Sequence, residues 1–155
     1  MIEWPKVKEF VARRAFFCAV ATWDEGTGIR LFPIGSMRVN AQGQATYFEI
    51  FARPVREGSP IVFLAVDANP IFWLISLLRG RFSHPPAIRL RGTVGIQRPA
   101  TESERQGWFR RVGLFLKTRG GRALWSNPKR IREVQLCHAE SVRVGPMTRG
   151  LENWV

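Results

Sequence analysis

The chain has 155 residues, of which 45% are hydrophobic, 12% aromatic and 23% charged. This length and composition exclude a disordered chain and are typical of one globular domain. The 24 Lys and Arg residues outnumber the 12 acidic ones, for a net charge of +12, and all but four of these cations are arginine. Because the planar guanidinium pairs well with phosphate and carboxylate, we expect an anionic partner: a phosphorylated cofactor, a nucleic acid or a membrane surface.

Cysteine and histidine are scarce. Cys18 and Cys137 lie far apart in the sequence, each in a strand-like run, which favours buried free thiols in a reducing compartment and therefore a cytoplasmic protein. A single disulfide or a redox pair stays open as an alternative. His84 and His138 are the only histidines and do not stand at a metal-ligand spacing from the cysteines, so we expect no structural metal.

In chain order, residues 1–14 are predicted to form a leading helix, because Val7, Phe10 and Val11 recur at helical spacing. Residues 15–23 form an apolar run that is expected to be the first core strand. Residues 29–51 alternate apolar and polar side chains and are predicted to form a β-hairpin, with strands over 29–39 and 45–51. Asn40 and Gly43 offer positive φ angles for the five-residue loop between them.

The next segment combines a buried strand with an unusual helix. Residues 61–66 form a continuous apolar run, which predicts a central strand. Asn69 and Pro70 favour a helix start, and the helix over 70–82 is apolar nearly all round. It is too short to span a bilayer, which takes about 20 residues. We expect it to be buried in a subunit interface or, as the second choice, to contact a membrane surface.

The second half repeats the pattern of strand and helix. Residues 87–97 alternate again, with Arg89 and Arg91 on one face of the predicted strand. Thr101 and Glu104 predict a capping box for a helix that ends near Lys117. A short helical turn follows through residue 125, the last strand covers about 134–144, and residues 147–155 form a tail.

This order predicts a mainly β protein of one domain, a six-stranded antiparallel barrel with peripheral helices. The barrel covers residues 15–146, with helical insertions near 70–82 and 101–125. No nucleophile elbow, Walker motif or dinucleotide-binding glycine motif is present in the sequence. A bound cofactor that carries its own chemistry therefore explains the chain better than a nucleophile-and-base enzyme does.

The sequence resembles the pyridoxamine 5′-phosphate oxidase-like family of FMN-binding split β-barrels over roughly residues 16–144. The resemblance rests on residues 16–67, FFCAVATWDEGTGIRLFPIGSMRVNAQGQATYFEIFARPVREGSPIVFLAVD, and on the later strand IRLRGTV. It implies a homodimer that binds FMN at its interface. The cofactor-binding residues that it implies are Pro33, Ile34, Gly35 and Ser36 at the ring, Arg53 and Arg56 at the phosphate, and Arg89 and Arg91 toward the partner's site. Ile50 is a further expected cofactor-binding residue.

The resemblance predicts a flavin-dependent oxidoreductase whose substrate the sequence does not identify. Relatives also use a deazaflavin or bind heme. The chain departs from the family over residues 49–54, where it lacks the threonine and the lysine that many members carry. The alternatives are a cofactor-free or non-FMN binding protein and a barrel that binds a polyanion such as RNA.

Overall fold

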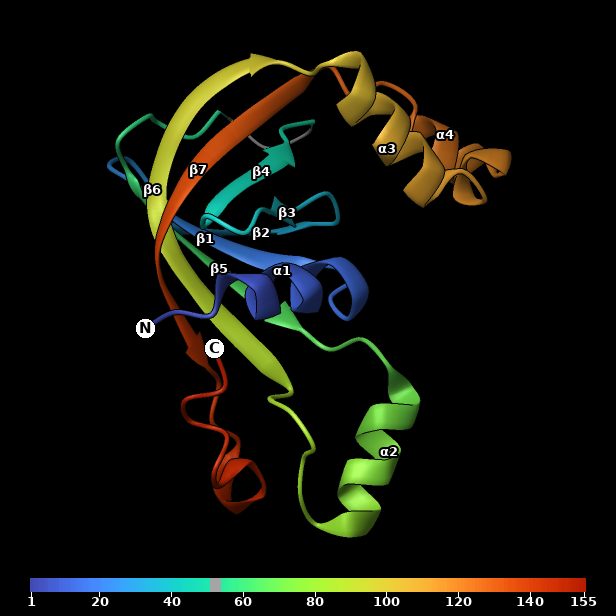
Figure 1. The fold of residues 1–155 in the computed structure, drawn as a ribbon. Coiled ribbons are helices and arrows are strands. Elements are labelled where there is room, and N and C mark those ends of the chain that lie inside the picture. Colours follow the sequence, from blue (N-terminus) through green and yellow to red (C-terminus); the bar gives the residue numbers. More distant parts are fainter. Residues whose placement is uncertain (51–53) are drawn as a thin grey trace.

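The computed structural model describes residues 1–50 and 54–155. Its body is a strongly curved antiparallel sheet of seven strands in the order β2-β1-β5-β6-β7-β4-β3 (Figure 1). The outer strands β2 and β3 do not pair with each other within the described residues, so the barrel is not closed. The strands are β1 (Cys18–Asp24), β2 (Gly28–Ile34), β3 (Arg38–Val39), β4 (Gln44–Phe48), β5 (Pro60–Val66), β6 (Ala87–Pro99) and β7 (Arg130–Ser141).

The predicted hairpin over residues 29–51 is wrong in its first strand. That segment is divided into β2, which pairs with β1, and β3, which pairs with β4, so the sheet has seven strands instead of six. The break falls at residues 35–37, where the Ser36 hydroxyl accepts a hydrogen bond from the Phe48 amide at 2.9 Å. In the short β3–β4 loop, Gly43 has a positive φ of 77°, whereas Asn40 stabilises the turn through its side-chain oxygen.

Helix α1 (Trp4–Arg13) packs against the sheet, as its sequence pattern predicts. Val7, Phe10 and Val11 are all buried in the main core. The C-terminal tail returns to the same core, where the Trp154 ring lies 6.0 Å from the Phe10 ring in an edge-on arrangement. Interior-facing side chains of β1, β4, β5, β6 and β7 fill the rest of this core, including Val20, Ala45, Phe63, Leu90 and Val134.

Helix α2 (Pro70–Arg79) projects from the end of the sheet opposite to α3 (Glu102–Val112) and α4 (Arg119–Trp125) (Figure 1). The Asn69 side chain caps it by accepting a hydrogen bond from the Ile71 amide at 3.0 Å, as the sequence predicts. Of its residues only Ser76 is fully buried. No helix among the described residues is long and apolar enough to cross a membrane.

The predicted helix over 101–117 divides into α3 and a separate 3-10 turn over residues 115–117. The capping box is present, since the Thr101 hydroxyl accepts from the Glu104 amide and Glu104 accepts from the Thr101 amide. A second apolar cluster forms between α3 and the ends of β4 and β7, and it contains Phe48, Trp108, Val112 and Ile131.

Strands β6 and β7 form the longest ladder and carry two register shifts, at Arg91/Gly92 and between Val94 and Gln97. A Cβ atom on Gly92 would lie 2.4 Å from the Gln135 carbonyl oxygen, so only glycine fits at the first shift. Beside this irregularity Cys137 is exposed, which corrects the expectation that both thiols are buried. Strand β7 also begins earlier than predicted, at Arg130.

Candidate functional site

An apolar pocket of about 420 Å³ lies between the end of β2, the end of β4 and the helices α3 and α4. We call it the ring pocket. Five of the nine sequence-predicted site residues line it, brought together from two segments of the chain. Among the described residues, its lining consists of Phe17, Phe32, Pro33, Ile34, Gly35, Ser36, Tyr47, Phe48, Ile50, Trp108, Leu124 and Trp125.

The break between β2 and β3 shapes one wall of the ring pocket. Pro33 has no backbone N–H, and Gly35 has no side chain to cover the backbone. A Cβ atom on Gly35 would lie 3.1 Å from the Phe17 ring, so a larger residue would enter the space beside that ring. Because Ser36 holds the Phe48 amide at 2.9 Å, the wall is tied to the end of β4.

Aromatic side chains form the opposite wall. The Trp108 ring is 3% exposed and lies 5.6 Å from the Phe48 ring. Its indole N–H donates to the Trp125 carbonyl oxygen at 3.2 Å, which links α3 to the end of α4. The sequence did not indicate that Trp108 meets β4. The only signal was the placement of two tryptophans within one insertion.

Tyr47 lines the ring pocket and also packs in the main core. The side chain is 1% exposed, and its hydroxyl has no hydrogen-bond partner among the described residues. Burial and then the nearby Glu49 carboxylate raise the pKa of Tyr47, while Arg132 opposes that shift. The hydroxyl therefore stays protonated at neutral pH. A buried hydroxyl without a hydrogen-bond partner destabilises the fold.

A buried ion pair stands next to the ring pocket. The Glu49 carboxylate accepts from the Arg132 guanidinium at 3.0 Å and from the Val55 amide at 3.2 Å. The Gln97 amide group also donates to Glu49. Arg132 in turn donates to the Gly95 carbonyl oxygen at 3.1 Å. Glu49 is thus committed to internal hydrogen bonds.

The structure does not bring Arg56, Arg89 or Arg91 to the ring pocket. Arg56 is exposed and pairs with Glu25 at 3.1 Å beside a different depression. Arg89 and Arg91 point away from the barrel interior and pair with Glu140 at 2.7 and 3.0 Å. Arg53 lies outside the described residues, and whether any of the nine residues binds a ligand stays a prediction.

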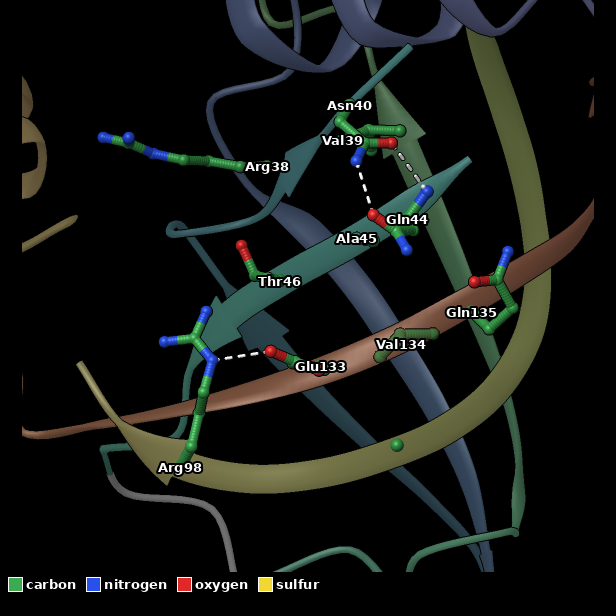
Figure 2. A pocket seen from close by; sticks show the side chains of 11 residues that line it. Arg38, Val39, Asn40, Gln44, Ala45, Thr46, Arg98, Glu133, Val134 and Gln135 are labelled. Atoms are coloured by element: carbon green, nitrogen blue, oxygen red, sulfur yellow. Dashed lines mark hydrogen bonds and ion pairs between the residues drawn. The ribbon is translucent and has the colours of Figure 1, made fainter. Parts of the chain in front are cut away.

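A polar groove of about 460 Å³ runs over β3, β4 and β7 on another face (Figure 2). Of its two arginines, Arg98 is paired with carboxylates and Arg38 extends away from the groove. Arg98 donates to Glu133 at 2.6 Å and to Glu104 at 2.8 and 2.9 Å, and Figure 2 shows the Arg38 side chain extending away from the groove. None of the eight sequence-predicted site residues that the structure describes lines this groove. Among residues 1–50 and 54–155, no three His, Cys, Asp or Glu side chains gather as metal ligands.

No protein-family model and no curated protein matches the chain. Solved structures do match. HupZ of Group A Streptococcus has 17% sequence identity and a TM-score of 0.55, with 94% of this chain and 97% of that chain covered. An FMN-binding protein from Syntrophomonas wolfei subsp. wolfei has 11% identity, a TM-score of 0.51, and 91% and 86% coverage. HutZ, the heme storage protein from Vibrio cholerae, has 13% identity, a TM-score of 0.50, and 89% and 92% coverage. These likenesses show that the chain has the split β-barrel fold of pyridoxamine 5′-phosphate oxidase-like proteins, as the sequence resemblance predicted.

Proposed function

We propose that the chain binds a planar, flavin-type cofactor, with FMN as the leading choice, in the ring pocket and acts as an oxidoreductase. The observation that carries this proposal is the convergence of Pro33, Ile34, Gly35, Ser36 and Ile50 on one apolar pocket. Planar ligands are held in such pockets by aromatic and aliphatic contact, with a few polar groups that fix their orientation. The substrate stays undefined.

The residues of the pocket fit this kind of ligand. Phe48 and Trp108 contribute to one apolar wall, and Pro33 to Ser36 form the other. A bound flavin would supply the electron transfer itself. The chain's own residues bind the ring, orient it and keep water from its buried side.

A second copy of the chain is the proposed partner. The outer face of β2, β1 and β5 is almost wholly apolar, and Trp23, Ile29 and Leu31 on it are 58%, 69% and 73% exposed. Apolar faces of this extent on soluble domains mark protein interfaces. The members of this apolar sheet face are Ala19, Ala21, Trp23, Ile29, Leu31, Pro33, Val62, Leu64 and Val66.

The apolar sheet face is continuous with the ring pocket, because Pro33 belongs to both. Arg89 and Arg91 border it on β6, directly opposite Leu64 and Val62 of β5. A homodimer formed through this face would therefore place these arginines at the interface, in keeping with the role that the family resemblance implies for them.

Spectroscopy and titration test the proposed cofactor. We expect the purified protein to show flavin absorption or to quench the fluorescence of added FMN. Gly35→Val, which puts a side chain beside Phe17, should weaken FMN binding by about tenfold or more, since a lost contact of about 1.4 kcal/mol has that effect. Gly26→Val is the matched control, in a turn that does not line the pocket. A colourless protein that leaves FMN fluorescence unchanged would refute the proposal.

Two alternatives to FMN binding are a different planar ligand in the ring pocket and a polyanion on the surface. Heme or a deazaflavin would also be a planar ligand of the ring pocket, and the heme storage protein from Vibrio cholerae shares this fold. Hemin added to the protein would then give a shifted absorption maximum that Gly35→Val weakens. A polyanion such as RNA would bind through surface arginines, and its affinity would fall steeply with salt and be unaffected by Gly35→Val.

A further inference from the structure

A second depression, of about 460 Å³, adjoins the ring pocket at the start of β7. We call it the basic subsite. Ile50 and Leu124 line both spaces, so the two lie side by side. The remaining lining residues of the basic subsite are Glu49, Ala123, Asn127, Lys129 and Arg130.

Backbone hydrogen bonds to two neighbouring strand ends hold Lys129 and Arg130 in place. The Lys129 carbonyl oxygen accepts from the Ala100 amide at 2.9 Å, and the Arg130 carbonyl oxygen accepts from the Glu49 amide at 3.0 Å. The first bond ties the segment to the end of β6, and the second ties it to the end of β4. The side chains of Lys129 and Arg130 therefore start from defined positions beside the ring pocket.

The charge of the basic subsite is positive. Its one carboxylate, Glu49, is neutralised by Arg132 at 3.0 Å inside the barrel. No carboxylate among residues 1–50 and 54–155 forms an ion pair with Lys129 or Arg130, whereas Arg56, Arg89 and Arg91 each have one. Two cations beside an apolar pocket attract a ligand that has both an apolar ring and an anionic end.

We propose that Lys129 and Arg130 bind the terminal phosphate or carboxylate of a ligand whose planar ring occupies the ring pocket. This inference rests on the proposed function and adds the anion site to it. Exposed cations bind a free anion weakly, because water screens them. A ring that is already seated in the pocket presents its own anionic end at high effective concentration, so the second contact forms within one complex.

The test compares ligands that differ only in the anionic group. Wild-type protein should bind FMN about tenfold or more tightly than riboflavin, because a charge-assisted hydrogen bond contributes about 1.5–3 kcal/mol. The K129Q/R130Q variant should bind FMN and riboflavin with nearly equal affinity and keep the riboflavin affinity of the wild type. R79Q/R81Q, which removes two charges at the far end of α2, is the matched control and should keep the preference for FMN.

Hemin and its dimethyl ester, which lacks the free carboxylates, test the same site with a carboxylate ligand. The wild type should prefer hemin to the ester, and K129Q/R130Q should lose this preference. Equal binding of the paired ligands by the wild type would overturn the anion site and leave the proposed ring pocket intact. The anion site would also be overturned if K129Q/R130Q kept the preference for FMN over riboflavin. The same holds if R79Q/R81Q lost that preference as fully as K129Q/R130Q. Failure of riboflavin, FMN and both heme ligands to bind the wild type would refute the proposed function itself. Circular dichroism melting curves verify that each variant is folded.

Discussion

The carboxylate of Glu49 and the guanidinium of Arg132 lie 3.0 Å apart, and their side chains are only 1% and 5% exposed. Removing one partner would leave an uncompensated buried charge. We therefore expect Arg132→Met to lower the free energy of unfolding by about 3–5 kcal/mol. Urea unfolding followed by tryptophan fluorescence measures this loss.

The double variant E49L/R132M is the control for that pair. Because it removes both charges and keeps apolar volume, we expect it to recover much of the stability that Arg132→Met loses. If the single and double variants were equally unstable, the loss would come from packing around the Arg132 side chain and not from an unpaired Glu49.

Leu31 tests the proposed dimer. The side chain is 73% exposed on the apolar sheet face, so Leu31→Glu places a charge there without disturbing the core. We expect this variant to be monomeric at concentrations where the wild type is dimeric, as measured by light scattering after size-exclusion chromatography. Leu114→Glu, at a 75% exposed position outside this face and outside α2, is the control and should stay dimeric. Leu78→Glu tests the sequence-based expectation that α2 lies in a subunit interface. A monomeric Leu78→Glu together with a dimeric Leu31→Glu would place the interface on α2.

The two thiols should differ in reactivity. Burial raises the pKa of the Cys18 thiol to about 12, an effect that Arg111 partly opposes, whereas Cys137 is exposed. We expect one thiol per folded chain to react with a disulfide reagent near about pH 8, and the second only on unfolding. Cys137→Ser should remove the fast reaction. Its persistence in that variant would show that Cys18 is accessible.

Glu104 should make stability depend on pH. Hydrogen bonds from Arg98, and then from the amide and hydroxyl of Thr101, lower the pKa of Glu104 to about 2, although burial opposes the shift. Because the folded pKa lies below the unfolded value of about 4.3, the stabilisation is complete above about pH 4.3 and is lost as the pH falls toward about 2.

The variant Glu104→Gln measures this contribution. At neutral pH we expect its melting temperature to be about 2–4 °C below that of the wild type, for a partly solvated pair that contributes about 1 kcal/mol. The difference should shrink as the pH falls below about 4. A difference that stays constant down to about pH 3 would assign the effect to the geometry of the capping box and not to its charge.

Local signals in the sequence predicted most helices correctly. Asn69 and Pro70 mark the start of α2, and Thr101 with Glu104 marks the start of α3, because capping depends on residues within one turn. The divided hairpin could not be predicted in this way. Met37 and Val39 continue the apolar alternation through the break, and alternation does not identify the strand with which a segment pairs.

The candidate site was predictable only in part. The resemblance gave Pro33–Ser36, and Ile50 was a further expected residue; all of them lie within one short segment of the chain. Trp108 reaches Phe48 from an insertion 60 positions along the sequence, and no periodicity encodes such a contact. Lys129 and Arg130 were visible as basic residues, but only the β4–β7 pairing places them beside Ile50.

The division between β2 and β3 also limits how far the barrel can open. The two strands lie at opposite ends of the strand order, yet only Gly35, Ser36 and Met37 separate them in the chain. Four Cα-to-Cα steps from Ile34 to Arg38 reach about 14 Å at full extension. This short covalent tether keeps the two edges together however the sheet flexes. The Pro33–Ser36 wall of the ring pocket therefore cannot move far from β3, so any widening of the pocket falls mainly to α3 and α4, which carry Trp108, Leu124 and Trp125 on its other side.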